Sequence, residues 1–433
     1  MTTIAAKIRK KRLNLIIRKE RLVYESRITD IQGYQLAKFN KLWVGIHQSI
    51  PYYRDLVHSG IVPATINTWD DFATFPILTR VSLQNNVTSY IDPSQNVTGW
   101  SLTGGSTGTP IRVPYRSSEK QLLMPNTWLG REFYGIEISD TMFHFWGHSH
   151  LFGSGWKRYI KQIERKIKDQ LLGFKTLSAY HLTPHRLREV GQAIIKMRPD
   201  YIIGYSRSLT LLARENVDKA EEFKRLPLKA IIATSEAFTD PGDAKMVEQV
   251  FDCRVGMEYG AVETGVMSYT HPADGRYRVF WDTYLLEAIP VNETDAQLFV
   301  TALYPRAMPL IRYSIGDSVR NYEGAGHSIV SFEAILGRDN DLIEVQQGSF
   351  VHSVALIHCV QAQQGVLGVQ VIEEKDKSIS FDIMCKKPLS EENEAIIRRN
   401  LSTLDPTLAE CRINYVDQLE QTIAGKTKWI IKR

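Results

Sequence analysis

The chain has 433 residues, of which 43% are hydrophobic and 23% are charged, so its composition is that of a globular protein and excludes disorder as the default state. This length exceeds what one small core can hold and predicts two domains. A formal net charge of +5 is too low for a chain coated with lysine and arginine, so we expect no nucleic-acid partner.

The cysteine and hydropathy patterns predict a cytoplasmic protein. The four cysteines are scattered, with no C-x-x-C pair and no histidine at zinc-finger spacing, which argues against both a disulfide framework and a structural zinc site. No apolar run approaches the roughly 18 to 20 residues that a helix needs to cross a bilayer. The N-terminus also lacks the apolar core of a secretory signal.

Residues 1–29 are predicted to form a basic helix. Residues 7–21 hold eight Lys/Arg and one Glu, a net charge of +7, which leaves the rest of the chain at −2. Ile4, Ile8, Leu15 and Leu22 fall close to one helical face, which suits peripheral contact between residues 7–21 and an anionic membrane. The same apolar residues would also pack a solvated basic helix onto the body of the protein, so both interpretations stay open.

The next 300 residues read as alternating strands and helices. Residues 34–56 have apolar residues at helical spacing, halted near Pro51. Strand-like runs occupy 110–116, 201–206, 229–236, 253–260 and 296–303, and helical patterns occupy 183–197 and 240–251. Such alternation indicates an α/β arrangement.

The pattern changes near Gly337. Residues 368–386 read as two strands, 390–404 as a helix and 411–418 as a further strand, which together form a small α+β unit. We therefore expect a large domain over residues 30–336 and a small domain over residues 337–433.

A glycine-rich loop, "SLTGGSTGTP", covers residues 101–110. Glycine lets backbone N–H groups approach an anion closely, and hydroxyls add donors, so the loop suits phosphate binding. Thr109-Pro110 stands where a Walker loop has Lys-Ser/Thr, and a G-x-G-x-x-G motif is absent, which disfavours both a P-loop NTPase and a dinucleotide site. By itself the loop could also be a surface turn.

Four further segments follow this loop in a particular order. They are "MEYGAVET" at 257–264, "PLIRYSIGDSVR" at 309–320, "LGRDND" at 336–341 and "AGKTKWIIKR" at 424–433. Together they resemble the adenylate-forming superfamily of acyl-CoA synthetases, adenylation domains and luciferases. The stretches "IPYYRDL" and "FPILTRVSL" are similar to the N-terminal signature of the phenylacetate-coenzyme A ligase and CapK-like branch, so the likeness runs from about residue 30 to the C-terminus.

The resemblance implies a fold and a reaction. The fold would be a large α/β N-terminal domain of sheets flanked by helices, followed by a small mobile α+β domain. The reaction would join a small carboxylic acid to AMP at the expense of ATP, with Mg²⁺, and then transfer the acyl group. Coenzyme A is the commonest acceptor in the relatives, whereas the CapK-like resemblance suggests an amine acceptor and a role in surface polysaccharide biosynthesis.

The resemblance also implies an ATP site. The glycine-rich loop would hold the β- and γ-phosphates, Tyr259 would stack on adenine, and Asp317 would accept both ribose hydroxyls. Val262 replaces the usual Thr or Ser that reaches the α-phosphate, and Thr264 would substitute for it. The full candidate set is Thr103, Gly104, Ser106, Thr107, Gly108, Thr109, Ser235, Glu236, Tyr259, Gly260, Thr264 and Asp317.

Three catalytic residues follow from the same resemblance. Glu263 would hold Mg²⁺, a hard cation that prefers carboxylate and phosphate oxygens. Arg338 would lie near the ribose and phosphate, and Lys426 would reach the adenylation site in one of two orientations of the small domain. The hinge between these orientations would be Asn340.

An aromatic stretch at 142–156 lies where this branch lines its acyl pocket. Phe145, Trp146, His148 and Phe152 are the candidate lining residues, and core packing is the alternative for them. A histidine metal site is disfavoured because the glycines of this stretch argue against the helix it would need.

A function of a different class is a catalytically silent scaffold, docked to a membrane or partners by the basic N-terminus. Val262 and Asn340 favour the scaffold. The residues that count against it are Glu263, Asp317, Arg338 and Lys426.

Overall fold

The computed structural model describes the chain from residue 30 onward, with gaps. The gaps are 103–111, 148–162, 164–166, 168, 236, 239–240, 291, 337–341, 347–348, 362, 364, 386 and 421–429. The basic N-terminal segment and most of the glycine-rich loop therefore lie outside the described residues.

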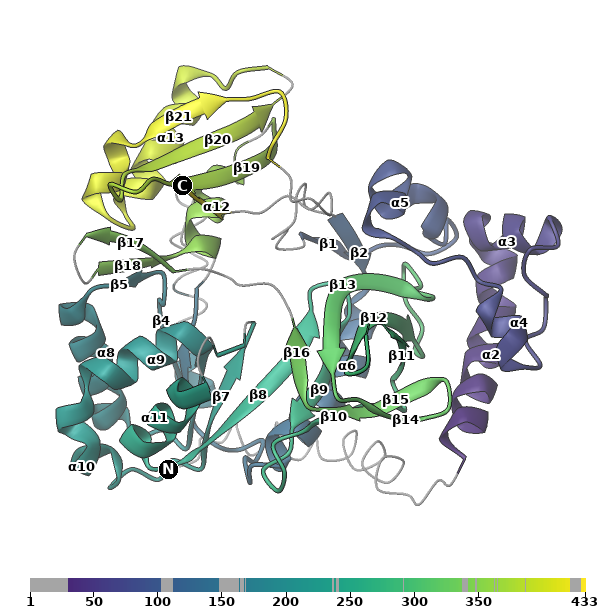
Figure 1. The fold of residues 1–433 in the computed structure, drawn as a ribbon, viewed down its shortest axis with the longest axis horizontal. Coiled ribbons are helices and arrows are strands. Elements are labelled where there is room, and N and C mark those ends of the chain that lie inside the picture. The colour runs from purple at the N-terminus through teal and green to yellow at the C-terminus, as the bar shows by residue number, and fades with distance from the viewer. Residues whose placement is uncertain are drawn as a thin grey trace.

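A mixed sheet of nine strands forms the centre of the molecule (Figure 1). Its parallel half consists of β4 (Phe174–Leu177), β3 (Met142–Phe145), β6 (Tyr201–Tyr205), β7 (Ala230–Thr234) and β8 (Arg254–Ala261). Its antiparallel half continues with β9 (Gly265–Thr270), β10 (Tyr277–Val279), β15 (Ser328–Phe332) and β14 (Glu323–Ala325). Every residue of β6 and β7 is buried, as expected for parallel strands that are covered on both faces.

Helices cover the parallel half of this sheet. They are α8 (Pro184–Met197), α9 (Ser206–Glu215), α10 (Ala220–Phe223) and α11 (Pro241–Phe251). Thr183 caps α8 by accepting from the Arg186 backbone N–H, and Pro184 starts the helix at its first position, where a missing N–H costs nothing. Leu187, Val190 and Ile194 of α8 then face the core.

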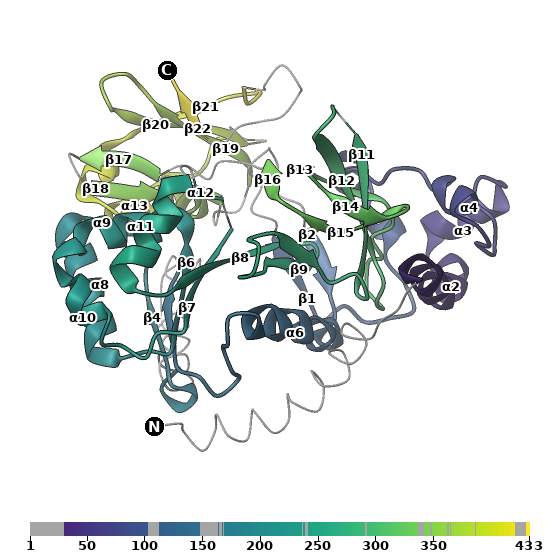
Figure 2. The same cartoon turned by 60° about the horizontal axis from the view of Figure 1, so that its bottom comes forward.

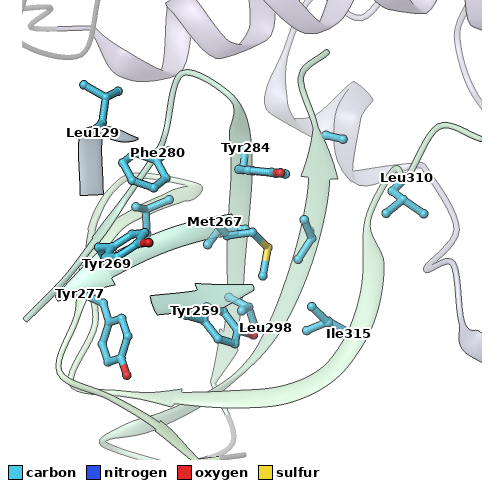
Figure 3. Close-up of a cluster of buried hydrophobic side chains, with 14 of the residues drawn as sticks. Leu129, Tyr259, Met267, Tyr269, Tyr277, Phe280, Tyr284, Leu298, Leu310 and Ile315 are labelled. Carbon is cyan, nitrogen blue, oxygen red and sulfur yellow. The ribbon is translucent and has the colours of Figure 1, made fainter. Parts of the chain in front are cut away.

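Helix α6 (Ser117–Glu132) packs against the antiparallel half of the sheet, below β8 and β9 in Figure 2. A Cβ at Gly130 would lie 2.0 Å from the Tyr269 ring, so only glycine allows this close approach. An aromatic core fills this part of the molecule, where Tyr259, Tyr269, Tyr277 and Tyr284 gather with Phe280 (Figure 3).

A second sheet is antiparallel and contains β11 (Tyr284–Pro290), β12 (Asp295–Ala302), β13 (Tyr313–Arg320) and β16 (Ala334–Leu336). The predicted strand at 296–303 is thus β12, in a sheet separate from the parallel strands. A ribbon of two strands, β1 (Gly99–Leu102) and β2 (Arg112–Tyr115), flanks the glycine-rich loop.

The N-terminal helices of the described region lie at one side, beside this second sheet. They are α2 (Ile31–Ser49), α3 (Pro51–His58), α4 (Trp69–Ala73) and α5 (Arg80–Asn85). The predicted halt at Pro51 is confirmed, and a new helix begins there with proline at its first position. Buried Gln35 anchors α2 by donating to the carbonyl oxygens of Trp281 (2.8 Å) and Tyr284 (3.2 Å).

The C-terminal region is α+β, as expected. Its sheet contains β21 (Arg412–Tyr415), β20 (Ile379–Cys385), β19 (Val366–Glu373) and β22 (Ile430–Lys432), with α12 (Ser353–Gln361) and α13 (Glu391–Ser402) beside it. The hairpin of β17 (Leu342–Gln346) and β18 (Ser349–His352) pairs with β5 (His181–Leu182) of the preceding region. The boundary near residue 337 stays a prediction, and this pairing joins the segments on its two sides.

Candidate active site

The carboxyl ends of four parallel strands meet at one edge of the central sheet. In register, Phe145 pairs with Gly204, Tyr205 with Thr234, and Thr234 with Glu258, so β3, β6 and β7 end near one level, and β8 continues beyond it to Ala261. In α/β folds, ligands bind in the crevice outside this edge. Trp146 and Ser235 follow β3 and β7, Tyr205 ends β6, and Tyr259 lies on β8 one residue beyond the end of β7, so all four are candidate ligand contacts.

Two predicted nucleotide-binding residues meet at this edge. The Tyr259 hydroxyl donates to Asp317 Oδ2 at 3.0 Å, although Tyr259 lies on β8 and Asp317 lies on β13 of the other sheet. The Tyr259 ring is largely buried, with edge contacts to Phe332 and Tyr277. A carboxylate has two oxygens with several lone pairs, so the bond from Tyr259 is compatible with Asp317 also accepting from a ribose.

Glu263 lies in the turn between β8 and β9, and its carboxylate is 7% exposed. Its Oε1 atom accepts from the Tyr313 hydroxyl at 3.3 Å and lies 3.9 Å from Arg80 Nη1. Arg80 begins α5, and the fold brings it here because the Leu78 backbone pairs with β13 (Leu78 N to Arg312 O, 3.1 Å; Ser314 N to Leu78 O, 2.9 Å). Sequence reasoning missed Arg80, although it ends the "FPILTR" part of the N-terminal signature.

The turn that carries Glu263 is held by buried donors. Arg306 Nη2 donates to the Glu263 carbonyl oxygen at 2.5 Å. The hydroxyls of Tyr304 (3.2 Å) and Tyr284 both donate to the Thr264 carbonyl oxygen. Gly265 follows at φ = +77°, in the left-handed region that favours glycine. The carbonyl groups of Glu263 and Thr264 therefore point into the protein. This orientation of the backbone fixes the direction of the Glu263 side chain.

The segment that contains Arg306 and Ala307 connects this turn to α6, the helix after the glycine-rich loop. Arg306 Nη1 donates to the Tyr304 hydroxyl (2.5 Å) and its Nε donates to the Met308 carbonyl oxygen (3.1 Å). Buried Glu119 of α6 accepts from the next backbone N–H, that of Ala307, at 2.7 Å. Burial by itself lowers the pKa of Arg306, but Tyr304 and Glu119 more than offset this, so the pKa is raised and the guanidinium stays charged.

Thr264 and Val262 occupy opposite environments in the same turn. The Thr264 hydroxyl accepts from the Ala261 N–H (3.2 Å) and donates to the Gly265 carbonyl oxygen (3.0 Å), and the residue is 1% exposed. The Thr264 hydroxyl, which was expected to take the place of the usual Thr or Ser hydroxyl, is therefore hydrogen-bonded to the backbone of its own turn. Val262 stands at the position of the usual Thr or Ser. It is 51% exposed, and its side chain has no hydrogen-bond donor.

The remaining candidate site residues that the structure describes lie either at the carboxyl edge of the parallel strands or in the hydrophobic core. Ser235 is exposed at the end of β7, with φ = +72°, a backbone conformation that is uncommon outside glycine and often found at functional sites. Trp146 is half-buried and stacks between His144 (ring centroids 5.3 Å apart) and Tyr205 (4.3 Å). Phe145 is fully buried in the core with Leu187, so its position matches the packing alternative rather than pocket lining.

The other predicted site residues lie outside the described residues. They are Thr103, Gly104, Ser106, Thr107, Gly108, Thr109, His148, Phe152, Glu236, Arg338, Asn340 and Lys426.

The side chains near Glu263 could hold a magnesium ion only if substrate phosphates supplied further ligands. Among the residues that the structure describes, no group of three or more His, Cys, Asp or Glu side chains could hold a metal ion. Mg²⁺ is commonly bound by one or two carboxylates together with substrate phosphates, so the lone Glu263 carboxylate suits this mode.

Among the residues that the structure describes, no helix is both long and apolar enough to span a bilayer.

Comparison with known proteins supports the resemblance along the whole chain. Residues 343–433 match the model of the CapK C-terminal domain. Protein CapK of Staphylococcus aureus is 23% identical over 424 residues, which cover 93% of this chain and 89% of CapK. A phenylacetate-coenzyme A ligase of Aromatoleum evansii is 22% identical over 436 residues, which cover 93% of this chain and 94% of the ligase.

A solved structure shows the same fold. The 2-hydroxyisobutyryl-CoA ligase in complex with 2-HIB-AMP and CoA, in the thioesterification state, aligns with a TM-score of 0.59 over 94% of this chain and 90% of that one, at 14% identity. The predicted resemblance is confirmed: the chain has the fold of the adenylate-forming ligases, is similar over 93% of its length to CapK and to a phenylacetate-coenzyme A ligase, and matches the model of the CapK C-terminal domain at residues 343–433.

Proposed function

We propose that this chain is an AMP-forming ligase that joins a small carboxylic acid to AMP with release of pyrophosphate and then transfers the acyl group to an acceptor. The observation that carries this proposal is the hydrogen bond between Tyr259 and Asp317, 58 residues apart, at the carboxyl edge of the parallel strands. Similarity to phenylacetate-coenzyme A ligase over 93% of the chain supports ligase chemistry of this type.

ATP would lie along this edge of the sheet. Asp317 would accept the ribose hydroxyls, and Tyr259 would contact adenine together with the Ser235–Glu236 and Gly260 backbone. The hydroxyl and N–H groups of Ser106, Thr107 and Thr109 would hold the β- and γ-phosphates. A loop with many weak donors can bind pyrophosphate and then release it, which a fixed lysine would hinder.

Glu263 would hold Mg²⁺ beside these phosphates. A bound Mg²⁺ stabilises negative charge on phosphate oxygens. Arg80, 3.9 Å from Glu263, adds positive charge on the same side, and the bonds from Arg306 and Tyr304 to the turn keep the carboxylate in one orientation. Preorganised charge of this kind is the main means by which enzymes stabilise phosphoryl transition states.

The small domain would complete the site in two orientations that exchange about Asn340. In the first, Lys426 donates to oxygens that gain charge during attack on the α-phosphate, with Arg338 near the ribose. In the second, Lys426 moves away and the acceptor enters. The acyl group would lie near Trp146, together with His148 and Phe152.

Two acceptors remain candidates for the second step. Coenzyme A is supported by the similarity to phenylacetate-coenzyme A ligases. An amine, in surface polysaccharide biosynthesis, is supported by the similarity to CapK and by the CapK C-terminal domain. Incubation of acid and ATP with either coenzyme A or amino sugars separates these acceptors by the product that accumulates.

The direct experiment is mass spectrometry of the purified protein for a co-purified acyl-AMP, which would also identify the acid. Acid-dependent exchange of pyrophosphate into ATP, measured over a panel of carboxylic acids, tests the same activity when no adduct co-purifies. If no acid supports exchange, the ligase proposal fails.

A catalytically silent scaffold is the second candidate, because exposed Val262 and the buried Thr264 hydroxyl leave this turn without the usual side-chain donor. Such a scaffold would bind ATP without exchanging pyrophosphate. In either case we propose a cytoplasmic protein whose basic residues 7–21 contact an anionic membrane.

A further inference from the structure

Glu258 is a half-buried carboxylate beside the candidate nucleotide site that the proposed reaction does not use. It precedes Tyr259 on β8, and successive side chains of a strand point to opposite faces of a sheet. Tyr259 bonds to Asp317 of the second sheet, whereas Glu258 accepts a hydrogen bond from the Tyr269 hydroxyl. The Tyr269 ring lies against Gly130 of α6. The Glu258 carboxylate therefore lies on the face of the central sheet that α6 covers.

The Glu258 carboxylate joins three neighbouring strands. Thr234, the last residue of β7, and Tyr269 of β9 both pair with Glu258 in register. The Thr234 hydroxyl donates to Glu258 Oε1 at 3.2 Å, and the Tyr269 hydroxyl donates to Oε2. Burial raises the pKa of Tyr269 well above its usual range, so this hydroxyl stays protonated and remains a donor. Both carboxylate oxygens are thus bonded within the protein.

Arg131 of α6 supplies the charge opposite to this carboxylate. Its Nη1 atom donates to the Tyr201 hydroxyl at 3.3 Å, and its Cζ atom lies 5.0 Å from the ring centroid of Trp128 and 5.6 Å from that of Tyr201. Burial by itself lowers the pKa of Arg131, but the nearby tyrosine hydroxyls and Glu258 more than offset this, so the pKa is raised and the guanidinium stays charged. A charged partner fixed by two rings keeps Glu258 in one orientation.

The bond from Thr234 to Glu258 anchors the residue just before the Ser235 turn. Ser235 has φ = +72°, a conformation that a residue other than glycine keeps only where the surrounding structure fixes it. Thr234 is 7% exposed, and its hydroxyl is held by the carboxylate. Glu258 is also the neighbour of Tyr259 along β8. One carboxylate therefore fixes the backbone on both strands that carry candidate adenine contacts.

We propose that Glu258 is a positioning residue for adenine, which acts through Thr234 to hold the Ser235 turn and so sets the preference for ATP over other nucleotides. This inference rests on the ATP site proposed above, in which the Ser235–Glu236 backbone contacts adenine. Glu258 would not touch the nucleotide itself, because its carboxylate lies on the α6 side of the sheet. A purely structural role would lower stability without changing the preference for one base.

The test is the dissociation constant of the full chain for ATP and for GTP, measured by equilibrium dialysis. Thr234→Val keeps the side-chain shape and removes only the donor, while Glu258 keeps its bond from Tyr269. Thr283→Val is the matched control, because Thr283 is also 7% exposed and its hydroxyl also donates at 3.2 Å, to Asn126 Oδ1. We expect Thr234→Val to weaken ATP binding by about threefold to tenfold while GTP binding changes little, and the control to match the native chain.

Thr234→Ser keeps the hydroxyl and should therefore bind ATP as the native chain does. Unchanged affinity for ATP in Thr234→Val would overturn the positioning role and leave the proposed ATP site intact. Equal losses for ATP and GTP, or equal losses in Thr234→Val and its control, would also overturn it, since they would reflect a general loss of stability. No binding of ATP by the native chain would contradict the proposed ATP site and this inference with it.

Discussion

Tyr259 and Asp317 illustrate how much the candidate site depends on single side-chain bonds. The Tyr259 hydroxyl reaches Asp317 across two sheets, and the ring is held by aromatic neighbours. The bond fixes one carboxylate oxygen, so the orientation of Asp317 toward a nucleotide depends on Tyr259.

Replacement of Tyr259 by Phe keeps the ring and removes this bond. Hydrogen bonds to charged groups contribute about 1.5 to 3 kcal/mol, so we expect the KM for ATP to rise by about tenfold or more, with a smaller change in kcat. Titration of ATP in the pyrophosphate-exchange assay measures both quantities. An unchanged KM for ATP would mean that Asp317 does not need Tyr259 for its orientation.

Arg80 shows which part of the site the sequence could not predict. The sequence placed Glu263, Asp317 and Tyr259 in family motifs, and the structure brings the last two into contact. The contact of Arg80 with Glu263 spans 183 positions and depends on the pairing of Leu78 with β13, which no local pattern encodes. Phe145 belongs to the aromatic stretch that the resemblance assigns to an acyl pocket, but alternation along β3 places it in the core, as the packing alternative expects.

Among the elements, local patterns predicted those with clear periodicity. The strands β6 and β7 are short, mostly apolar runs, and α8 has its own N-cap residue and an apolar face, so each was predicted from neighbouring residues. The strand at 296–303 was also correct, but its membership in an antiparallel sheet was not predictable, because its partners β11 and β13 are chosen by tertiary packing. The pairing of β18 with β5 is likewise a long-range choice.

The bonds from Arg306 join the turn before β9 to the segment before β13, and its charge interacts with buried Glu119 of α6, so its loss should affect stability. Replacement of Arg306 by Met leaves buried Glu119 near an apolar side chain and the carbonyl oxygens of Glu263 and Met308 without their donor. We expect a loss of about 2 to 6 kcal/mol in the free energy of unfolding, because two buried carbonyl oxygens lose their donor at roughly 1 to 3 kcal/mol each. Urea denaturation measures this loss.

The control for Arg306 is Arg320→Met. Arg320 also makes two short bonds, to Asp295 at 2.8 and 3.0 Å, but its side chain is 45% exposed. An exposed ion pair contributes about 1 kcal/mol at most, so this variant should unfold at nearly the same urea concentration as the native chain. Similar losses in both variants would contradict the role assigned to burial at Arg306.

At the scale of the whole molecule, the basic segment proposed to contact a membrane is separate in sequence from the residues proposed to carry the chemistry. Residues 1–22 precede every predicted site residue, so their removal should leave activity in solution nearly intact. Binding to anionic vesicles should weaken, because each basic residue near such a surface contributes about 1 kcal/mol. Added salt should weaken the binding of the full-length chain through screening. Unfolding of the truncated chain would instead mean that the segment packs on the body.

The proposed rotation of the small domain predicts that Lys426→Ala separates the two half-reactions. Loss of one preorganised donor typically costs about 10²- to 10³-fold in rate, so formation of the acyl-AMP should fall by this factor. Transfer from preformed acyl-AMP to the acceptor should change little, because in the proposed second orientation Lys426 would lie away from the site. Lys432→Ala, another lysine of the same C-terminal segment, serves as the control. An equal loss in both half-reactions would contradict the two-orientation mechanism.

The most direct test of adenylate formation compares acid-dependent ATP–pyrophosphate exchange in the native chain and in Glu263→Gln. This substitution keeps the side-chain volume while removing the charge that would hold Mg²⁺. Glu222→Gln, at an exposed position on α10, is the matched control. We predict that one carboxylic acid supports exchange in the native chain and in the control, and that exchange in Glu263→Gln falls by roughly 10²-fold or more. Undiminished exchange in Glu263→Gln would contradict the role proposed for Glu263. No acid-dependent exchange in the native chain would contradict adenylate formation itself.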